Sequence, residues 1–364
     1  MGLFLVHMVE YFDLYWYRPE KSFFNDFAFL LFGGKAYVVF ALLFGVSFFI
    51  IMDNQRRKGI DFRAGFAWRL FILLVIGFLH SLVYGGDILV VLALTGFILI
   101  PIFNCRNGVI LLISLFFLMQ IPAIIFCVFQ VNSGLSAVPS HWALFGKIFG
   151  PYANGTFMEL IHTTLWDAQA AKWVFMLESG RLSTIIGASI LGFLLGRIDF
   201  FRKIEENSKK NLQGFIFFLI LAIILFTFAD KLPVYSNWLA AAIIESYKNL
   251  FFTIAGILLF IFLFNFSEVR KILLLLSHPG KMSLTVYIFQ SLVFVPFYYG
   301  FGLAAYSYIG QARAFFLGIF FWVIQLFITY HWNKNFYYGP LEWLWRAATY
   351  RSLDIPFKKV ERSS

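Results

Sequence analysis

The sequence predicts an all-α protein, a polytopic membrane helix bundle with about ten transmembrane helices. Of its 364 residues, 61% are hydrophobic and only 13% are charged, whereas soluble domains are about 45–50% apolar and about 25% charged. The mean hydropathy is +0.80. The chain also contains 50 phenylalanines, which suit a lipid-facing surface and would promote aggregation on a water-facing one.

The N-terminal stretch LFLVHM (3–8) resembles the second half of a membrane helix. Glu10 and Asp13 follow it before the about 20 apolar residues that a span needs. We therefore expect the native start to lie upstream of Met1. Residues 19–35 are too short and too interrupted by Gly and Asn for a span, so we expect an interfacial or re-entrant helix there.

Nine further apolar runs follow, separated by polar or charged connections. The predicted spans cover roughly residues 36–52, 67–84, 88–103, 108–131, 173–197, 214–229, 250–266, 282–299 and 314–332. In the predicted span 173–197, Gly187, Gly192 and Gly196 have spacings that allow another helix to approach closely.

The basic residues alternate with these spans. Most of the 29 Lys and Arg residues fall in segments that the alternation places on the inner side, as the positive-inside rule requires. The net charge of +10 therefore reflects topology and does not indicate nucleic-acid binding. We expect a single integral membrane domain (1–364) with both termini on the inner side. It has a long outer loop (132–172) and a basic inner tail (333–364). Membrane lipids are the expected surroundings.

The sequence gives no support for a metal site or a disulfide framework. Cys105 and Cys127 belong to no Cys-x-x-Cys motif, and the six histidines are scattered without metal-ligand spacing.

His80 and Asp87 are the strongest candidates for chemistry. Both lie in the stretch 69–96, where two apolar runs meet at Gly85-Gly86-Asp87. Ionisable groups within a membrane are costly and call for an explanation. A histidine oriented by a carboxylate is a usable general base. Alternatively, His80 is a hydrogen-bonded interior histidine and Asp87 caps the following helix.

Other polar residues could complete a site. Glu178 and Arg181 are three residues apart, so on one helix they would share a face and could pair or bind substrate. Gln290 and Gln325 lie in apolar runs, where they could bind a ligand or hydrogen-bond across helices. In the tail, Glu342 and Arg346 have a spacing that favours an ion pair on a membrane-surface helix.

Four stretches carry a resemblance to a known family. They are FGGKAYVVFALLFGVSF (32–48), the Gly-x-x-His followed by Gly-Asp-Ile-Leu (77–89), GKMSLTVYIFQS (280–291) and GPLEWLWR (339–346). With them the chain resembles the YeiB-like family of bacterial inner-membrane proteins, which is defined by a domain of unknown function. Lys281 and Val286 depart from the family's pattern.

That family is in turn distantly similar to transmembrane acyltransferases. The resemblance implies transfer of an acyl group from a cytoplasmic coenzyme A thioester to an outer-side acceptor such as a sugar or a lipid-linked molecule. It implies that His80 takes the acceptor's proton and Asp87 orients His80. Inner basic residues, Arg69 among them, would receive the phosphates of coenzyme A.

Two other functions fit the sequence. A transporter or flippase of a small or lipid-linked solute would use Glu178, Arg181, Gln290 and Gln325 as a polar path. The absence of a clear repeat or of a pair of broken helices speaks against it. A non-catalytic membrane scaffold or sensor would use the Trp-rich tail and the basic face as lipid or partner contacts.

Overall fold

The computed structural model describes residues 2–132, 139–203 and 207–359. The described residues form helices and connecting turns, with one isolated bridge between Phe336 and Lys358 in place of any strand. The predicted all-α class is therefore confirmed. The first half of the chain comprises α1 (Gly2–Val9), α2 (Phe23–Leu31), α3 (Ala36–Arg56), α4 (Arg63–Ser81), α5 (Leu89–Ile102), α6 (Asn107–Leu118), α7 (Ile121–Asn132), α8 (Ser140–Asn154), α9 (Phe157–Leu165) and α10 (Asp167–Glu178).

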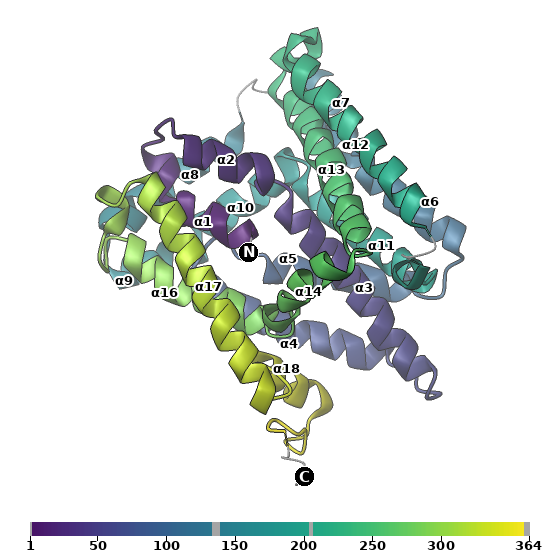
Figure 1. Ribbon diagram of the computed structural model, residues 1–364. Coiled ribbons are helices and arrows are strands. Elements are labelled where there is room, and N and C mark those ends of the chain that lie inside the picture. Colours follow the sequence, from purple (N-terminus) through teal and green to yellow (C-terminus); the bar gives the residue numbers. More distant parts are fainter. Residues whose placement is uncertain (1, 133–138, 204–206, 360–364) are drawn as a thin grey trace.

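The second half begins with long helices and ends in a short amphipathic one. It comprises α11 (Arg181–Arg197), α12 (Ser208–Phe228), α13 (Trp238–Leu263), α14 (Ser267–Leu275), α15 (Ser277–Gly280), α16 (Ser283–Tyr298), α17 (Gln311–Asn335) and α18 (Pro340–Tyr350). Helices α12 and α13 form a long antiparallel pair at one side, whereas α17 and α18 run along the other (Figure 1).

Five helical segments of the described chain are long and apolar enough to cross a membrane: 23–56, 63–81, 208–231, 238–263 and 311–335. The number rises to seven if α6 with α7 and α9–α10 with α11 each count as one bent span. The expected ten spans are thus not confirmed, partly because two predicted spans, α5 and α16, form helices of only 14 and 16 residues. The exposed apolar side chains of α12, such as Phe217 at 57% and Ile223 at 54%, indicate a lipid-facing surface.

Helices α3 and α11 form the tightest contact of the bundle. A Cβ atom at Gly192 would collide with the Leu42 carbonyl, and one at Gly45 would collide with the Ser189 carbonyl. Glycines therefore let the two backbones approach directly, as the glycine spacing in the predicted span 173–197 indicates.

The predicted span 173–197 is not one straight helix, so the prediction of a single helix there is wrong. Helix α10 ends at Glu178, Gly180 adopts a left-handed conformation (φ +69°) and α11 leaves at 70° to the preceding helix. Likewise α6 and α7 meet at 41°, next to Gln120 with φ +54°. The two breaks contact one another, because Gln120 Nε2 donates a 2.7 Å hydrogen bond to Thr184 Oγ1.

The segment predicted as a long outer loop contains helices. Helices α8 and α9 and the start of α10 lie within the predicted loop 132–172, of which residues 133–138 lie outside the described residues. Helix α8 packs against α10 and against the turn that follows α1. This packing encloses a cavity lined by residues of α8 and α10.

Candidate functional site

His80 and Asp87 form a buried pair at the turn between α4 and α5. Nδ1 of His80 is 2.7 Å from Oδ1 of Asp87, and their side chains are 1% and 0% exposed. The second carboxylate oxygen accepts a 3.0 Å hydrogen bond from the Val90 backbone N–H. Asp87 thus contacts His80 and caps α5 at once, so the contacts that each alternative requires are both present.

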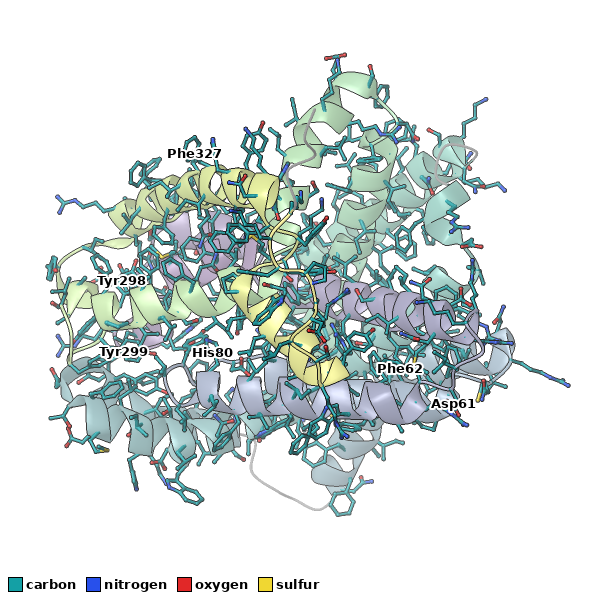
Figure 2. All side chains as sticks on the ribbon, turned by 90° about the horizontal axis from the view of Figure 1, so that it is seen from below. Asp61, Phe62, His80, Tyr298, Tyr299 and Phe327 are labelled. Carbon is teal, nitrogen blue, oxygen red and sulfur yellow. The ribbon has the colours of Figure 1, made fainter. Side chains whose placement is uncertain are left out.

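The pairing determines where the imidazole carries its proton. A carboxylate only accepts hydrogen bonds, so Nδ1 of His80 must donate. In the neutral ring the lone pair is then on Nε2, which has no hydrogen-bond partner among the described residues. The ring contacts Tyr287 of α16 and Tyr84, with centroid distances of 5.1 and 6.2 Å. His80 lies at one end of α4, whereas Asp61 and Phe62 precede the other end (Figure 2).

A cavity of about 330 Å³ lies beside this pair. Its walls come from the end of α1 and the residues after it, the turn 84–86, and helices α8, α10 and α11. Its charged or titratable lining, tyrosines aside, consists of His7, Glu10, Asp13, His141, Lys172 and Arg181. Its aromatic lining includes Trp16, Trp142, Phe145, Phe149 and Phe175. Its size and mixture of apolar walls with few polar groups are typical of small-molecule sites.

Tyr84 separates His80 from the cavity. Tyr84 lines the cavity, whereas His80 does not. The Tyr84 hydroxyl is 3.0 Å from Nδ1 of His7, and the His7 and Tyr84 rings meet edge to face at 5.2 Å. His7 also interacts electrostatically with His80. Tyr84 therefore lies between the cavity and His80, although Nε2 of His80 hydrogen-bonds to neither Tyr84 nor His7.

Two carboxyl groups of the cavity hold their protons unusually strongly. Burial and then the nearby Asp13 raise the pKa of Glu10 to about 8. Burial raises the pKa of Asp13 to about 6, although a Tyr84 hydrogen bond and the charge of Arg181 act in the opposite direction. Glu10 also accepts a 2.7 Å hydrogen bond from Trp16 Nε1. At neutral pH Glu10 is therefore mostly neutral and Asp13 mostly ionised.

Glu178 and Arg181 lie near this cavity but do not pair. Because the chain breaks at Gly180, the two residues do not share a helix face. Glu178 instead contacts Nδ1 of His141 at 2.6 Å and accepts the Ser140 and His141 backbone N–H groups at 3.1 Å each. Arg181 lines the cavity, with its guanidinium 4.5 Å from the Phe175 ring centroid. The suggested Glu178–Arg181 pair is wrong.

Arg69 and Gln290 lie away from the cavity lining. The Arg69 guanidinium stacks on Trp345 of α18 at 3.7 Å from the ring centroid, and Trp345 Nε1 donates to the Arg69 carbonyl at 2.9 Å. Gln290 Nε2 donates to Gln325 Oε1 at 2.8 Å, which is the interhelical hydrogen bond that the sequence left as one of two alternatives.

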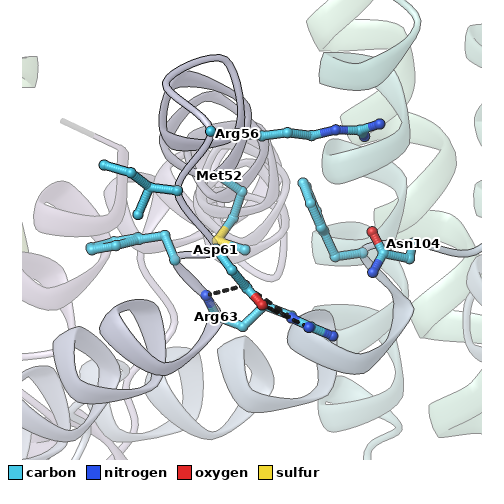
Figure 3. Close-up of a pocket in the computed structure, with 9 residues that line it drawn as sticks. Met52, Arg56, Asp61, Arg63 and Asn104 are labelled. Carbon is cyan, nitrogen blue, oxygen red and sulfur yellow. Dashed lines mark hydrogen bonds and ion pairs between the residues drawn. The ribbon is translucent and has the colours of Figure 1, made fainter.

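Another pocket, of about 310 Å³, opens near the C-terminal end of α3 (Figure 3). Its charged groups include Arg56, Asp61 and Arg63. Asp61 and Arg63 already pair with each other at 2.7 Å, and both are exposed. This pocket therefore lacks the buried, unpartnered groups of the first cavity.

Sequence reasoning missed the roles of Glu10, Asp13, Tyr84, His141 and Lys172. Glu10 and Asp13 carried a signal, because they interrupt an apolar helix early. His141 and Lys172 belong to the outer loop, whose length alone suggested function. Nothing in the spacing joined these segments. The described residues contain no group of three or more His, Cys, Asp or Glu residues placed to hold a metal ion.

Comparison with known proteins agrees with the predicted resemblance. Residues 195–352 match the family described as "Protein of unknown function (DUF418)". Over 337 residues the chain is 26% identical to the uncharacterized protein YxaH of Bacillus subtilis, covering 90% of this chain and 82% of YxaH. It is 25% identical over 339 residues to an uncharacterized 39.9 kDa protein of Bacillus acidopullulyticus, covering 92% and 86%.

The uncharacterized protein YeiB of Escherichia coli is also similar, at 24% identity over 359 residues that cover 90% of this chain and 85% of YeiB. No solved structure matches. The predicted resemblance is thus confirmed: the chain is a helical, membrane-type relative of the bacterial YeiB and YxaH proteins and carries the DUF418 family's sequence pattern over residues 195–352.

Proposed function

We propose that this protein is a membrane acyltransferase that moves an acyl group from a cytoplasmic coenzyme A thioester to an outer-side acceptor such as a sugar. We place it in the bacterial cytoplasmic membrane with both termini cytoplasmic. The observation that supports this most is the buried His80–Asp87 pair, whose free Nε2 lies behind Tyr84, a residue that lines a largely apolar cavity with a few polar groups.

In the proposed reaction, His80 accepts the acceptor's proton and Asp87 orients His80. The acceptor O–H or N–H bond breaks as its proton passes to Nε2 of His80 by way of the Tyr84 hydroxyl. The acceptor atom bonds to the thioester carbonyl carbon, the C–S bond breaks and the thiolate leaves with the electron pair. Asp87 holds the imidazole in the reactive tautomer and stabilises the imidazolium.

The cavity suits a small polar acceptor. Aromatic rings such as Trp142 and Phe149 can stack on the apolar face of a sugar. Carboxyl groups such as Glu10 can accept hydrogen bonds from its hydroxyl groups. Arg181 has no carboxylate partner among the described residues and offers a planar set of donors to an acceptor oxygen.

The main test compares acyl transfer in His80→Asn and Asp87→Asn with the wild type. The probe is acetyl-coenzyme A with glucosamine, followed by thiol release from detergent-purified protein. General-base catalysis contributes about 10²–10⁴-fold, so we expect losses in that range in variants that remain folded. Wild-type rates in a folded His80→Asn variant would disprove the proposal.

The donor side is tested by ligand-dependent stability. A ligand that binds only the folded state at 100 times its dissociation constant adds about 2.7 kcal/mol. We expect coenzyme A to raise the melting temperature saturably, and we expect Arg69→Ala to abolish the shift if Arg69 leaves Trp345 to bind a phosphate. A shift that persists in Arg69→Ala would place the donor elsewhere.

A transporter of a small or lipid-linked solute is the second candidate, and the structure adds an argument that the sequence lacked. Two broken helices meet at their breaks, and α13 supplies donors to the freed carbonyls: Tyr247 to Met119 at 2.6 Å and Ser246 to Ser179 at 2.9 Å. Broken helices at a binding site are typical of secondary transporters. Uptake of radiolabelled glucosamine into proteoliposomes without any acyl donor would favour this function.

A further inference from the structure

A second buried histidine–carboxylate pair lies at the same cavity, and its histidine lines the cavity directly. His141 of α8 is held by Glu178 of α10 at 2.6 Å. Like Asp87, Glu178 uses its remaining bonding capacity on a helix N-terminus, here that of α8. The same arrangement therefore occurs twice, on different helices, beside one space of about 330 Å³.

The two pairs differ in their access to the cavity. The His141 side chain is 8% exposed and the His80 side chain 1%. Because Nδ1 of His141 donates to Glu178, Nε2 is the ring nitrogen left for a molecule in the cavity. It makes no hydrogen bond with the residues that the structure describes.

The surroundings of His141 favour a defined ring position. Its imidazole packs against Phe175 at 5.0 Å, Trp142 at 5.3 Å and Trp238 of α13 at 6.2 Å. The charged groups that share its cavity are His7, Glu10, Asp13, Lys172 and Arg181. The carboxylate in contact with the ring is Glu178.

We propose that His141, oriented by Glu178, is the second proton-transfer group of this site and protonates the departing thiolate. The inference rests on the proposed acyl transfer and adds the acid that the first pair cannot supply while it acts as a base. Paired groups with opposite proton roles are a common arrangement in enzymes.

Each turnover moves one proton to His80 and one proton from His141. As the acceptor's proton moves to Nε2 of His80, the acceptor oxygen bonds to the carbonyl carbon and the C–S bond breaks. The sulfur then takes the proton from Nε2 of the His141 imidazolium. The turnover leaves His80 protonated and His141 neutral, and a proton that returns from His80 to His141 through water, Tyr84 or His7 restores both.

The test uses two acetyl donors with different leaving groups. Acetyl-coenzyme A releases a thiolate, which takes up a proton near neutral pH because ordinary thiols have a pKa near about 8.5. 4-Nitrophenyl acetate releases a nitrophenolate, a much weaker base that departs without an acid. Each donor is given with glucosamine to the full-length protein in detergent. The variants are His141→Asn, Glu178→Gln and His80→Asn, with the exposed His162→Asn of α9 as matched control.

We expect His141→Asn to lower kcat with acetyl-coenzyme A about 100-fold and to leave the nitrophenyl ester rate close to the wild type. His80→Asn should slow both donors, and His162→Asn neither. Asn retains a donor close to the Nδ1 position, so α8 should stay attached to Glu178.

Equal slowing of both donors by His141→Asn, or no slowing of either, would overturn the role of His141 while acyl transfer stands. A wild-type protein that consumes neither donor above the His80→Asn background would instead overturn the proposed function, and the inference with it.

Discussion

Polar groups at α18 and at the cavity beside His80 differ in how fully they are hydrogen-bonded. At α18, Glu342 accepts hydrogen bonds from the Leu284 and Thr285 backbone N–H groups and from Thr285 Oγ1, at 2.6, 3.0 and 2.6 Å. Arg69 is covered by Trp345. At the cavity, Nε2 of His7, Nε2 of His80 and the Tyr152 hydroxyl are buried without a hydrogen-bond partner among the described residues.

The difference separates structure from function. A satisfied polar network stabilises a fold, whereas a buried unpartnered group costs free energy and calls for a ligand, a water or a chemical role. Through Glu342 and Trp345, the GPLEWLWR motif therefore binds α18 to the start of α16 and to α4. These two helices carry Tyr287 and His80. We expect changes at the contacts of α18 to lower stability and changes at the cavity to lower activity.

The largest stability effect is expected for Glu342→Ala. It removes three hydrogen bonds that the carboxylate accepts from the first turn of α16. Each is worth about 1.5 kcal/mol or more, so the free energy of unfolding should fall by about 4 kcal/mol. Thermal unfolding in detergent measures it. The matched control is Glu268→Ala on α14, whose carboxylate forms an exposed pair with Lys271 and contributes little. If both variants melt alike, α18 does not hold the bundle together.

Glu10→Gln should change how stability depends on pH. The folded-state pKa of Glu10 is raised to about 8 from 4.5, so the folded protein binds this proton more tightly than the unfolded chain does. The contribution of Glu10 to the free energy of unfolding is therefore fully present below about pH 4.5 and is lost as pH rises through about 8. Because Glu10 lines a cavity and is half-buried, we expect a loss of about 2 kcal/mol across this window after screening.

A glutamine side chain at this position does not titrate, so the Glu10→Gln variant should lack this part of the slope. Melting temperatures measured across the window between the two pKa values test it, with Glu159→Gln on exposed α9 as control. A wild-type slope that persists in Glu10→Gln would assign the pH dependence to another group.

The sequence predicted the helical class, the glycine contact and the His80–Asp87 pair, because these depend on composition or on neighbours in the chain. It did not predict the cavity, because Glu10, His141 and Lys172 come from three separate segments. It also assigned Glu178 to Arg181 and Glu342 to Arg346 from helical spacing alone. Glu178 instead contacts His141, Glu342 contacts α16, and Arg346 donates to the Tyr338 hydroxyl at 2.7 Å. Tertiary partners outcompeted the local ones.

The smallest effect is expected at Gln290, which the sequence offered as a substrate-binding residue. Its hydrogen bond to Gln325 joins α16 to α17, and such bonds between membrane helices are worth about 0.6 kcal/mol. Gln290→Leu should therefore lower stability by about 1 kcal/mol, since it also leaves Gln325 Oε1 unpartnered. The double variant Gln290→Leu/Gln325→Leu should regain most of that loss, with acyl transfer unchanged in both. A fall in kcat/KM that the second substitution does not restore would instead return Gln290 to the substrate path and favour a solute route between α16 and α17.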